Sequence, residues 1–325
     1  MRARGFFKGL LIFGMVMTLA MAGSWAHSAE KEYPNREIEI VVPFSAGGMV
    51  DLAVRVIADE LAKNLGVPTV IVTKAGAGGT IGAQYVSQAK PDGYTLLLGP
   101  HSLYCIEPAL QPNLPYKTTD LVPVARFVNY PFVLAVRKAA PWKTFEELIA
   151  YAKKTPGKMS YASSGVGSGS HVIVEMLKVE AGLDIQHIPY KGGPGQLVAV
   201  LGGHSDFLYC GLPAVLPELR SGDLRPLVAA EKIPEFPKIP TVAEKGYPGS
   251  ALASWAAFSV PKGTPKAVID KIANAVEKAV KVPKLAAKLQ DIGGSVQFVA
   301  KEELGQEIER DIKRMTEFIK KAKLI

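Results

Sequence analysis

Short apolar runs alternate with segments of helical periodicity along most of the chain. Residues 37–43 form an apolar run typical of a buried strand, and apolar residues then recur every three or four positions over 50–65, which predicts a helix ending at Gly66. Further strands are predicted at 70–72, 95–98, 132–136, 159–162, 188–190, 206–209, 224–229 and 255–260. Further helices are predicted at 81–89, 144–154, 171–181, 194–201, from 265 onward and over 304–319. This β–loop–α–β order predicts an α/β protein with parallel sheets flanked by helices.

Two of the predicted helices begin with capping signals. Thr144 and Glu147 have the S/T-x-x-E spacing of a capping box. Thr264 precedes Pro265, which we expect to be the first residue of its helix. Residues 231–249 are rich in proline, glycine and lysine, which predicts an irregular connection.

The first 29 residues have the layout of a secretory signal peptide. A basic start is followed by an apolar run over 9–22 and by small residues that allow cleavage after Ala26 or Ala29. The basic residues are Arg2, Arg4 and Lys8. A membrane anchor is the alternative, but the run is shorter than the roughly 20 apolar residues that a spanning helix needs. We therefore expect a cleaved, exported, periplasmic protein.

Composition and charge indicate a globular protein with two domains. The chain has 325 residues, 48% of them hydrophobic and 21% charged, and domains usually span roughly 100–200 residues. The formal net charge is +8, and three of the positive charges belong to the predicted signal peptide. The remaining excess is mild and does not indicate a nucleic-acid partner.

Two loops rich in glycine and serine, at 45–48 and 163–170, each join a predicted strand to a predicted helix. At such a junction, unpaired backbone N–H groups and the positive end of the helix point to one place, which suits an anion. Glycine also lets the backbone approach a ligand closely. A tight turn without a ligand is the alternative for either loop alone, but two such loops in successive α/β units favour binding.

The sequence lacks the usual cofactor, hydrolase and metal patterns. There is no Walker motif, the G-x-G-x-x-G spacing fails at Ser170 and at Ile81, and no G-x-S-x-G surrounds Ser168. The histidines outside the predicted signal show no metal-ligand spacing, and there is no C-x-x-C. We therefore expect no cofactor, no metal site and no enzymatic activity.

Other polar residues follow the predicted strands. His101 and His171 lie where a side chain faces a ligand at the carboxyl edge of a sheet, although packing near a loop is an equal alternative. Asp51 and Arg55 form an i,i+4 pair in the first helix, where a structural role is favoured over ligand contact. Lys191 either adds a cation to the site or is solvated.

Several short segments occur in an order that covers nearly the whole chain after the predicted signal. They are P-F-S-A-G-G-x-x-D-x-x-x-R at 43–55, G-A-G-G-x-I-G at 76–82, P-D-G-Y-T at 91–95, Y-A-S-S-G-x-G-S at 161–168, P-Y-K-G at 189–192, L-G-G at 201–203, S-W at 254–255 and P-x-G-T-P at 261–265. Together they resemble the Bug-type solute receptors of tripartite tricarboxylate transporters.

The resemblance implies a periplasmic-binding-protein fold of the second type, with two α/β lobes and a ligand cleft between them. One lobe would comprise 30–130 and 251–325, and the other 131–250. Such a receptor captures a small organic carboxylate and delivers it to membrane permease subunits. The carboxylate would be held by backbone amides, hydroxyls and ordered water from the loops 44–48 and 163–168. We expect a monomer.

The residues and the resemblance together give one set of candidate ligand-binding residues. They are Phe44, Ser45, Ala46, Gly47, Gly48, Asp51, His101, Ser102, Ser163, Ser164, Gly165, Val166, Gly167, Ser168, His171, Tyr190, Lys191 and Cys210. Four positions are less polar here than is common in the resembled family, namely Met49-Val50, Val166, Cys210 and Ala256. This difference favours an aromatic or medium-chain carboxylate over citrate or an amino acid.

Three alternatives remain open at this point. A receptor that signals to a sensor kinase would share the same motifs, and a binding protein of an ABC importer fits them less well. A hydrolase using Ser168 or Ser170 with His171 would need a base and an acid that no motif supplies.

Cys105 and Cys210 fall in different predicted lobes, so a disulfide would lock a hinge, and we expect both to be unpaired.

Overall fold

The structure is a computed structural model that describes residues 32–111, 113–252 and 254–322. The predicted signal peptide at 1–29 and its cleavage sites lie outside the described residues. Residues Arg36–Ile325 form one compact unit, and the two sheets of the fold lie within it. We call each sheet with its helices a lobe.

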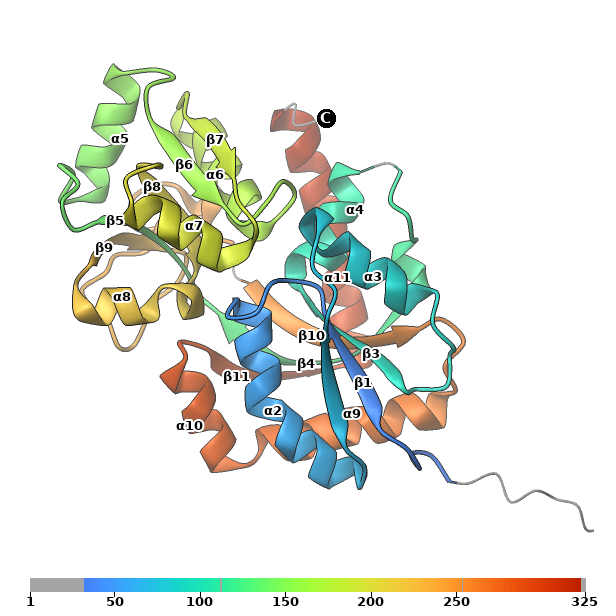
Figure 1. Ribbon diagram of the computed structural model, residues 1–325. Helices are drawn as coiled ribbons and strands as arrows, with labels where there is room; N and C mark the ends of the chain where they lie inside the picture. The colour runs from blue at the N-terminus through green and yellow to red at the C-terminus, as the bar shows by residue number, and fades with distance from the viewer. Residues whose placement is uncertain (1–31, 112, 253, 323–325) are drawn as a thin grey trace, which may run out of the picture. The chain divides into compact units, whose positions relative to one another are not determined.

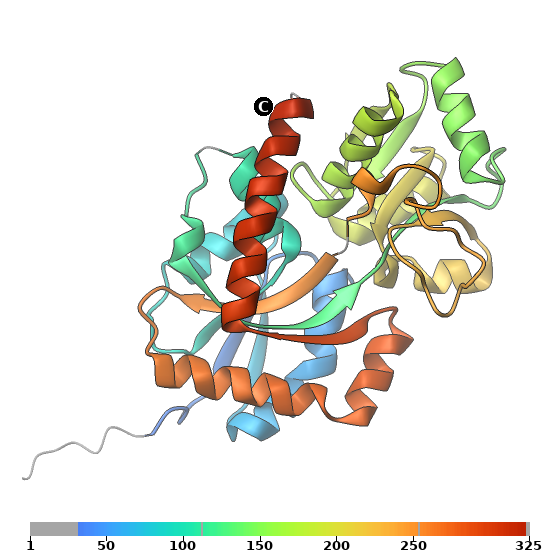
Figure 2. The ribbon, with the colours of Figure 1, turned by 180° about the vertical axis from the view of Figure 1, so that it is seen from behind.

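The first lobe is built on a six-stranded sheet (Figure 1). The strands run in the order β11 (Ser295–Ala300), β4 (Leu121–Tyr130), β10 (Ser254–Pro261), β3 (Thr95–Pro100), β1 (Ile38–Val42) and β2 (Thr69–Thr73). On one side of this sheet lie α2 (Met49–Leu65), α9 (Lys266–Val280) and α10 (Pro283–Asp291). On the other side lie α3 (Thr80–Ser87) and α11 (Lys301–Ala322), which comes to the front in Figure 2. Both sides of the sheet are therefore covered.

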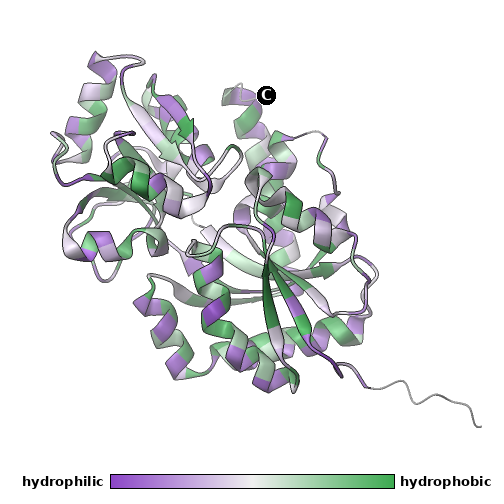
Figure 3. Ribbon diagram, viewed as in Figure 1, coloured by the Kyte–Doolittle hydropathy of each residue, from purple (hydrophilic) through white to green (hydrophobic). Residues whose placement is uncertain are grey.

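The second lobe is built on a five-stranded sheet. Its strands are β7 (Gln186–Pro189), β6 (Ser160–Ser163), β8 (Phe207–Gly211), β5 (Phe132–Arg137) and β9 (Leu224–Ala229), in that order. Alternate residues of β5 enter separate cores. Leu134 packs with α5 (Phe145–Lys154) and α6 (Gly169–Ala181), whereas Val133 packs with α7 (Gly192–Leu201) and α8 (Leu216–Ser221). This period of two is the pattern of a strand buried on both faces, and Figure 3 shows hydrophobic residues gathered on the strands and the helix sides facing them.

The sheets are mixed, so the prediction of parallel sheets was only partly right. β1, β2 and β3 pair in parallel, but β10 is antiparallel to both β3 and β4, and β5 is antiparallel to both β8 and β9. The reason is the path between the lobes, because β4 ends at Tyr130 and β5 begins at Phe132 with no crossover helix between them. The chain returns through β10.

The sequence analysis missed two strands. β4 carries Pro123, Arg126 and Asn129 within its apolar run, and β11 has exposed and partly buried positions along most of its length. Neither strand therefore shows the continuous apolar run from which the other strands were predicted.

Helix α11 contacts the cores of both lobes. Leu304 and Ile308 pack with Trp255 and Ala257 of the first sheet. About two to three turns further along, Met315 and Ile319 belong to the core that contains α5 and α6. The helix therefore connects the lobes along one side.

The capping predictions gave different outcomes. Thr144 caps α5 as predicted, because its Oγ1 accepts a hydrogen bond from the Glu147 N–H at 3.2 Å. Pro265, however, is the residue before α9 and not its first helical residue, and the Thr264 hydroxyl donates to the Pro261 carbonyl oxygen at 2.7 Å. The Thr264 hydroxyl therefore bonds to the end of β10 and does not cap α9.

Cys105 and Cys210 are both buried and unpaired, as expected. No helix in the described part of the chain has the length and apolar character needed to cross a membrane.

Candidate functional site

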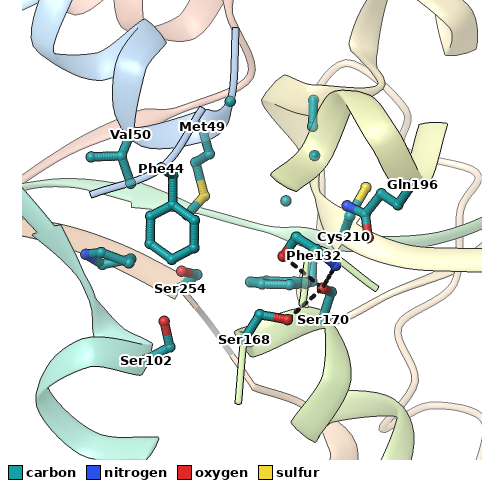
Figure 4. Close-up of a pocket in the computed structure, with 17 residues that line it drawn as sticks. Phe44, Met49, Val50, Ser102, Phe132, Ser168, Ser170, Gln196, Cys210 and Ser254 are labelled. Atoms are coloured by element: carbon teal, nitrogen blue, oxygen red, sulfur yellow. Dashed lines mark hydrogen bonds between the residues drawn. The ribbon is translucent and has the colours of Figure 1, made fainter. Parts of the chain in front are cut away.

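Three strand-to-helix junctions meet around one cavity. β1 leads into α2 through the loop 43–48, β6 leads into α6 through 164–168, and β7 leads into α7 at Gly192. The first residues of all three helices line the cavity, which Figure 4 shows in close-up. Because the first N–H groups of a helix have no partner within it, this arrangement directs backbone donors from both lobes at one place.

The cavity has a volume of about 70 Å³ and is lined by both lobes. Its lining residues are Phe44, Gly48, Met49, Val50, Pro100, Ser102, Phe132, Ser164, Ser168, Gly169, Ser170, Gly193, Gln196, Cys210, Gly211, Ala214 and Ser254. None of these described residues carries a charge. A neighbouring hollow of about 550 Å³ shares Phe44 and Ser164 with the cavity and extends to the glycine turn 76–79 and to Lys191.

The start of α2 is held by Asp51 instead of by a side-chain cap. Gly48, the residue before the helix, makes no side-chain cap hydrogen bond. The buried Asp51 carboxylate accepts from the Gly47 N–H and from Arg55 Nε, both at 2.9 Å. The predicted pair of Asp51 and Arg55 is thus confirmed, and Asp51 fixes the loop that carries Phe44.

The start of α6 is held by a network of serine hydroxyls (dashed lines in Figure 4). Ser168 Oγ accepts from the His171 N–H at 3.3 Å and donates to the Gly165 carbonyl oxygen at 2.6 Å. Ser170 Oγ accepts from the Ser164 N–H at 2.9 Å and lies 3.0 Å from Ser168 Oγ. The conformation of the loop is therefore held by hydrogen bonds within the protein itself.

The His171 ring supports this loop from behind. Its Nδ1 accepts a hydrogen bond from the Gly167 N–H at 3.2 Å, and its ring stacks on His187 at 4.2 Å between centroids. Burial lowers the pKa of His171, and burial together with His171 lowers the pKa of His187 to about 4. Both rings are then neutral at pH 7. The hydroxyls of Ser168 and Ser170 bond to the backbone and to each other. The structure therefore does not support a hydrolase in which one of these serines is paired with His171.

The sequence-predicted candidates divide into three groups. The cavity is lined by Phe44, Gly48, Ser102, Ser164, Ser168 and Cys210. The neighbouring hollow is lined in addition by Ser45, Gly165, Val166, Tyr190 and Lys191. Neither is lined by Ala46, Gly47, Asp51, His101, Ser163, Gly167 or His171.

Several lining residues were not among the candidates. They are Met49, Val50, Pro100, Phe132, Gly169, Ser170, Gly193, Gln196, Gly211, Ala214 and Ser254. The most informative is Gln196, which is the fifth residue of α7 and is 2% exposed. The sequence signal for Gln196 is the junction between β7 and α7. It is a strand-to-helix junction of the same kind as those at the two glycine loops.

Around the cavity, loops of the two lobes are in contact. A Cβ atom built on Gly211 would lie 2.8 Å from Met49 Sδ, and one built on Gly192 would lie 3.2 Å from Ser45 Oγ. Gly47 similarly approaches Pro194, with 3.8 Å between its Cβ position and Cγ. Glycine at these positions allows the backbones to approach closely enough to enclose the cavity.

Glu107, the first residue of α4 (Glu107–Leu110), lies between the glycine loops of the two lobes. A Cβ atom built on Gly78 of the first lobe would lie 2.2 Å from Glu107 Oε1, and one built on Gly167 of the second lobe would lie 2.1 Å from it. The side chain is fully buried, Oε2 accepts from the Gln111 amide, and Oε1 has no partner among the described residues. Burial raises the pKa of Glu107 to about 7.

His101 does not line the cavity, although its chain neighbours Pro100 and Ser102 do. Its Nε2 is 2.9 Å from Asp311 Oδ2 on α11, and Trp255 packs edge-on against its ring. His101, Asp311 and Cys105 place their potential ligand atoms within 4.8 Å of one another, a grouping that the sequence did not predict. The pKa of Asp311 is nevertheless lowered by hydrogen bonding to His101 and by the nearby arginines, so the carboxylate already has cationic and hydrogen-bonding partners.

Comparison with known proteins identifies relatives over nearly the whole chain. The sequence profile of the family described as "Tripartite tricarboxylate transporter family receptor" matches residues 53–324. Protein BugT of Bordetella pertussis is 39% identical over 256 residues, which cover 77% of this chain and 78% of BugT. The solved structure of R. palustris Rpa4515 with adipate has 31% identity and a TM-score of 0.86, covering 90% of this chain and 98% of that one. MatC from Rhodopseudomonas palustris with bound malate has 32% identity and a TM-score of 0.83, covering 88% and 99%.

The two sheets, the cavity between their loops and these structural matches define a two-lobed solute-binding protein. Such proteins bind a solute for transport and are not enzymes. The chain belongs to the tripartite tricarboxylate transporter receptor family.

Replacing Glu107 by glutamine should change how stability depends on pH. The glutamate pKa is about 4.3 in an unfolded chain and about 7 here, so the folded protein binds more protons within this window. Its free energy of unfolding must then fall as pH rises through the window. At about 1.4 kcal/mol per pKa unit, the stability of Glu107→Gln relative to the parent should rise by about 4 kcal/mol between acidic pH and about pH 8.

Urea unfolding of parent and variant across this pH range measures the effect. Glu309→Gln, at an exposed position on α11, is the matched control and should show the same difference from the parent at every pH. A Glu107→Gln difference that does not vary with pH would contradict the raised pKa.

Proposed function

We propose that this protein is a periplasmic receptor that binds a small organic carboxylate between its lobes and delivers it to the permease subunits of a tripartite tricarboxylate transporter. Export would use the signal peptide predicted at 1–29. The observation that carries the proposal is the convergence of helix N-termini from both lobes on a cavity lined by uncharged described residues. A carboxylate matches such a site because it accepts several N–H bonds and is stabilised by the positive helix ends.

The energy available from such contacts matches the affinity that a receptor needs. Micromolar binding requires about 8 kcal/mol. A hydrogen bond to a charged group contributes about 1.5–3 kcal/mol, and a helix end contributes up to about 2 kcal/mol. Four to six amide and hydroxyl donors with two helix ends therefore offset the cost of association without an arginine.

Apolar side chains line the remainder of the cavity. Phe44, Met49 and Val50 come from the first lobe, and Phe132 and Ala214 from the second. Burying apolar ligand surface against these residues stabilises the complex by roughly 25 cal/mol per Å². This lining favours an aromatic or medium-chain carboxylate over citrate or an amino acid. The relatives named with adipate and malate support a carboxylate ligand in general.

We further propose that the ligand enters by separation of the lobes about the two connecting segments. The division would place 30–130 and 251–325 in one lobe and 131–250 in the other. The contacts of Gly192, Gly211 and Gly167 with the opposite lobe belong to the closed form. Because α11 packs on both cores, opening would repack Met315 and Ile319 at its second half.

Thermal unfolding against a panel of acids tests the proposed ligand class. The panel holds benzoate and its derivatives, straight-chain acids, adipate, malate, citrate and aspartate, each beside its methyl ester as a control. A ligand at about 100 times its Kd should add about 2.7 kcal/mol of stability, which raises Tm by several degrees. We expect aromatic or medium-chain acids to give the largest rise and their esters to give none.

Two outcomes of the panel would contradict different parts of the proposal. A clear preference for citrate or aspartate would overturn the aromatic or medium-chain assignment and leave the carboxylate receptor standing. A rise that is equal for acids and esters, or the absence of a rise with every acid, would contradict carboxylate binding itself.

Gly167→Ala should weaken ligand binding because the new methyl group would meet the Glu107 carboxyl across the lobe contact. Gly167 has a φ of +79°, so the variant also carries backbone strain. Gly182 at the other end of α6 has a φ of +65° and no atom within 4 Å of its Cβ position, so Gly182→Ala provides the matched control. We expect both variants to unfold at lower temperature, whereas only Gly167→Ala should raise Kd, by about tenfold or more.

Isothermal titration with the best acid of the panel gives Kd for both variants. Equal Kd values for Gly167→Ala and Gly182→Ala would show that the contact with Glu107 does not limit closure.

A further inference from the structure

Gln196 has no hydrogen-bond partner for its side-chain amide within the described part of the chain. It is the fifth residue of α7, is 2% exposed and lines the cavity. Its Oε1 is completely buried and unbonded. In Figure 4 the amide lies on the α7 side of the cavity, away from Phe44 and Met49.

An unbonded buried amide is costly and therefore informative. A buried carbonyl without a donor costs about 1–3 kcal/mol, and native proteins leave few such groups. A primary amide needs a partner that donates to its oxygen and accepts from its nitrogen. Because the side chain faces the cavity, that partner is most simply a group on the bound ligand.

The surroundings of Gln196 are electrically neutral. Cys210 and Ala214 line the same side, and burial raises the pKa of the Cys210 thiol well above neutrality, so the thiol is uncharged. The start of α7 also offers few free donors, because the Gly192 N–H already donates to the Ser164 carbonyl oxygen at 3.2 Å and Pro194 has no N–H. The starts of α2 and α6 therefore suit the ionised carboxylate better than the start of α7 does.

A second ionised carboxylate fits this end of the cavity poorly. It would accept from the amide nitrogen but leave Oε1 without a donor, and its charge would be buried without a cation or a free helix end. A methyl group would leave both ends of the amide unbonded. A hydroxyl group can bond to either end of the amide without adding a charge, because it donates through its hydrogen and accepts through its oxygen.

We infer that Gln196 selects a ligand whose end remote from the carboxylate carries a neutral hydroxyl group. The ligand class is then a hydroxylated monocarboxylate, on an aromatic or medium-chain frame. This inference rests on the proposed function, since it places the carboxylate at the starts of α2 and α6.

Two series of ligands that differ only at the remote end test the inference. The aromatic series is 4-methylbenzoate, 3-hydroxybenzoate, 4-hydroxybenzoate and terephthalate, and the straight-chain series is heptanoate, 6-hydroxyhexanoate and adipate. Isothermal titration of the full mature protein should show that, in at least one series, the hydroxylated acid binds about tenfold or more tightly than both the methyl and the dicarboxylate members.

Variants show whether Gln196 is the cause of this preference. Gln196→Met keeps the length of the side chain without its hydrogen-bonding groups, and should remove the preference for hydroxyl while the methyl-ended acid still binds. Val198→Ala, on the exposed side of the same helix, is the control and should keep the preference. A readout that compares two ligands on one folded variant separates this effect from a loss of stability.

The remaining outcomes overturn different parts of the account. If methyl-ended or dicarboxylate members bind as well as or better than the hydroxylated acids, the assignment of Gln196 is wrong and the carboxylate receptor stands. The same holds if Gln196→Met keeps the preference for hydroxyl. If no acid of either series binds, the inference fails together with the aromatic or medium-chain assignment, and binding of malate, citrate or aspartate in the thermal panel decides whether the carboxylate receptor stands.

Discussion

The helix N-termini that meet at the cavity have to provide the positive potential that charged side chains provide in many anion sites. Among the described residues that line the cavity, none is charged, so backbone N–H groups are the main donors available to an anion. Such donors are effective only when their loops hold still, because a loop that must be ordered on binding costs free energy. Asp51 holds the loop before α2, and Ser168, Ser170 and His171 hold the loop before α6. These polar residues therefore support binding without all of them lining the cavity.

The second requirement is that the backbones of the two lobes come close together. Glycines at the contacts allow this, and Glu107 fills the space between Gly78 and Gly167. A carboxyl group in that buried position is more stable when protonated, which is why its pKa is raised. The contact between the lobes that encloses the cavity thus includes a titratable group, Glu107, that does not itself line the cavity.

Much of the fold and the two main loops could be predicted from the sequence. The apolar positions of β1 and the 3–4 spacing of α2 and α11 follow directly from burial, and glycine next to serine at a strand-to-helix junction predicts exposed backbone donors. Gln196 lies within the helix predicted at 194–201, but it was missed because the sequence alone does not show that its side chain lines a cavity between the lobes. The place of His101 also could not be read locally, since its partner Asp311 is 210 residues away in sequence. The antiparallel strands were missed for a related reason, because strand direction depends on how the chain passes between lobes and not on local periodicity.

The central claim is that a ligand carboxylate is held by backbone N–H groups at the starts of α2 and α6. A crystal structure of the protein with its tightest-binding acid tests this most directly. The account predicts both carboxylate oxygens within about 2.7–3.1 Å of the N–H groups of Met49, Val50, Gly169 and Ser170, with the apolar part of the ligand against Phe44 and Phe132. A carboxylate paired instead with Lys191 or another cation, or a ligand bound outside this cavity, would contradict the account.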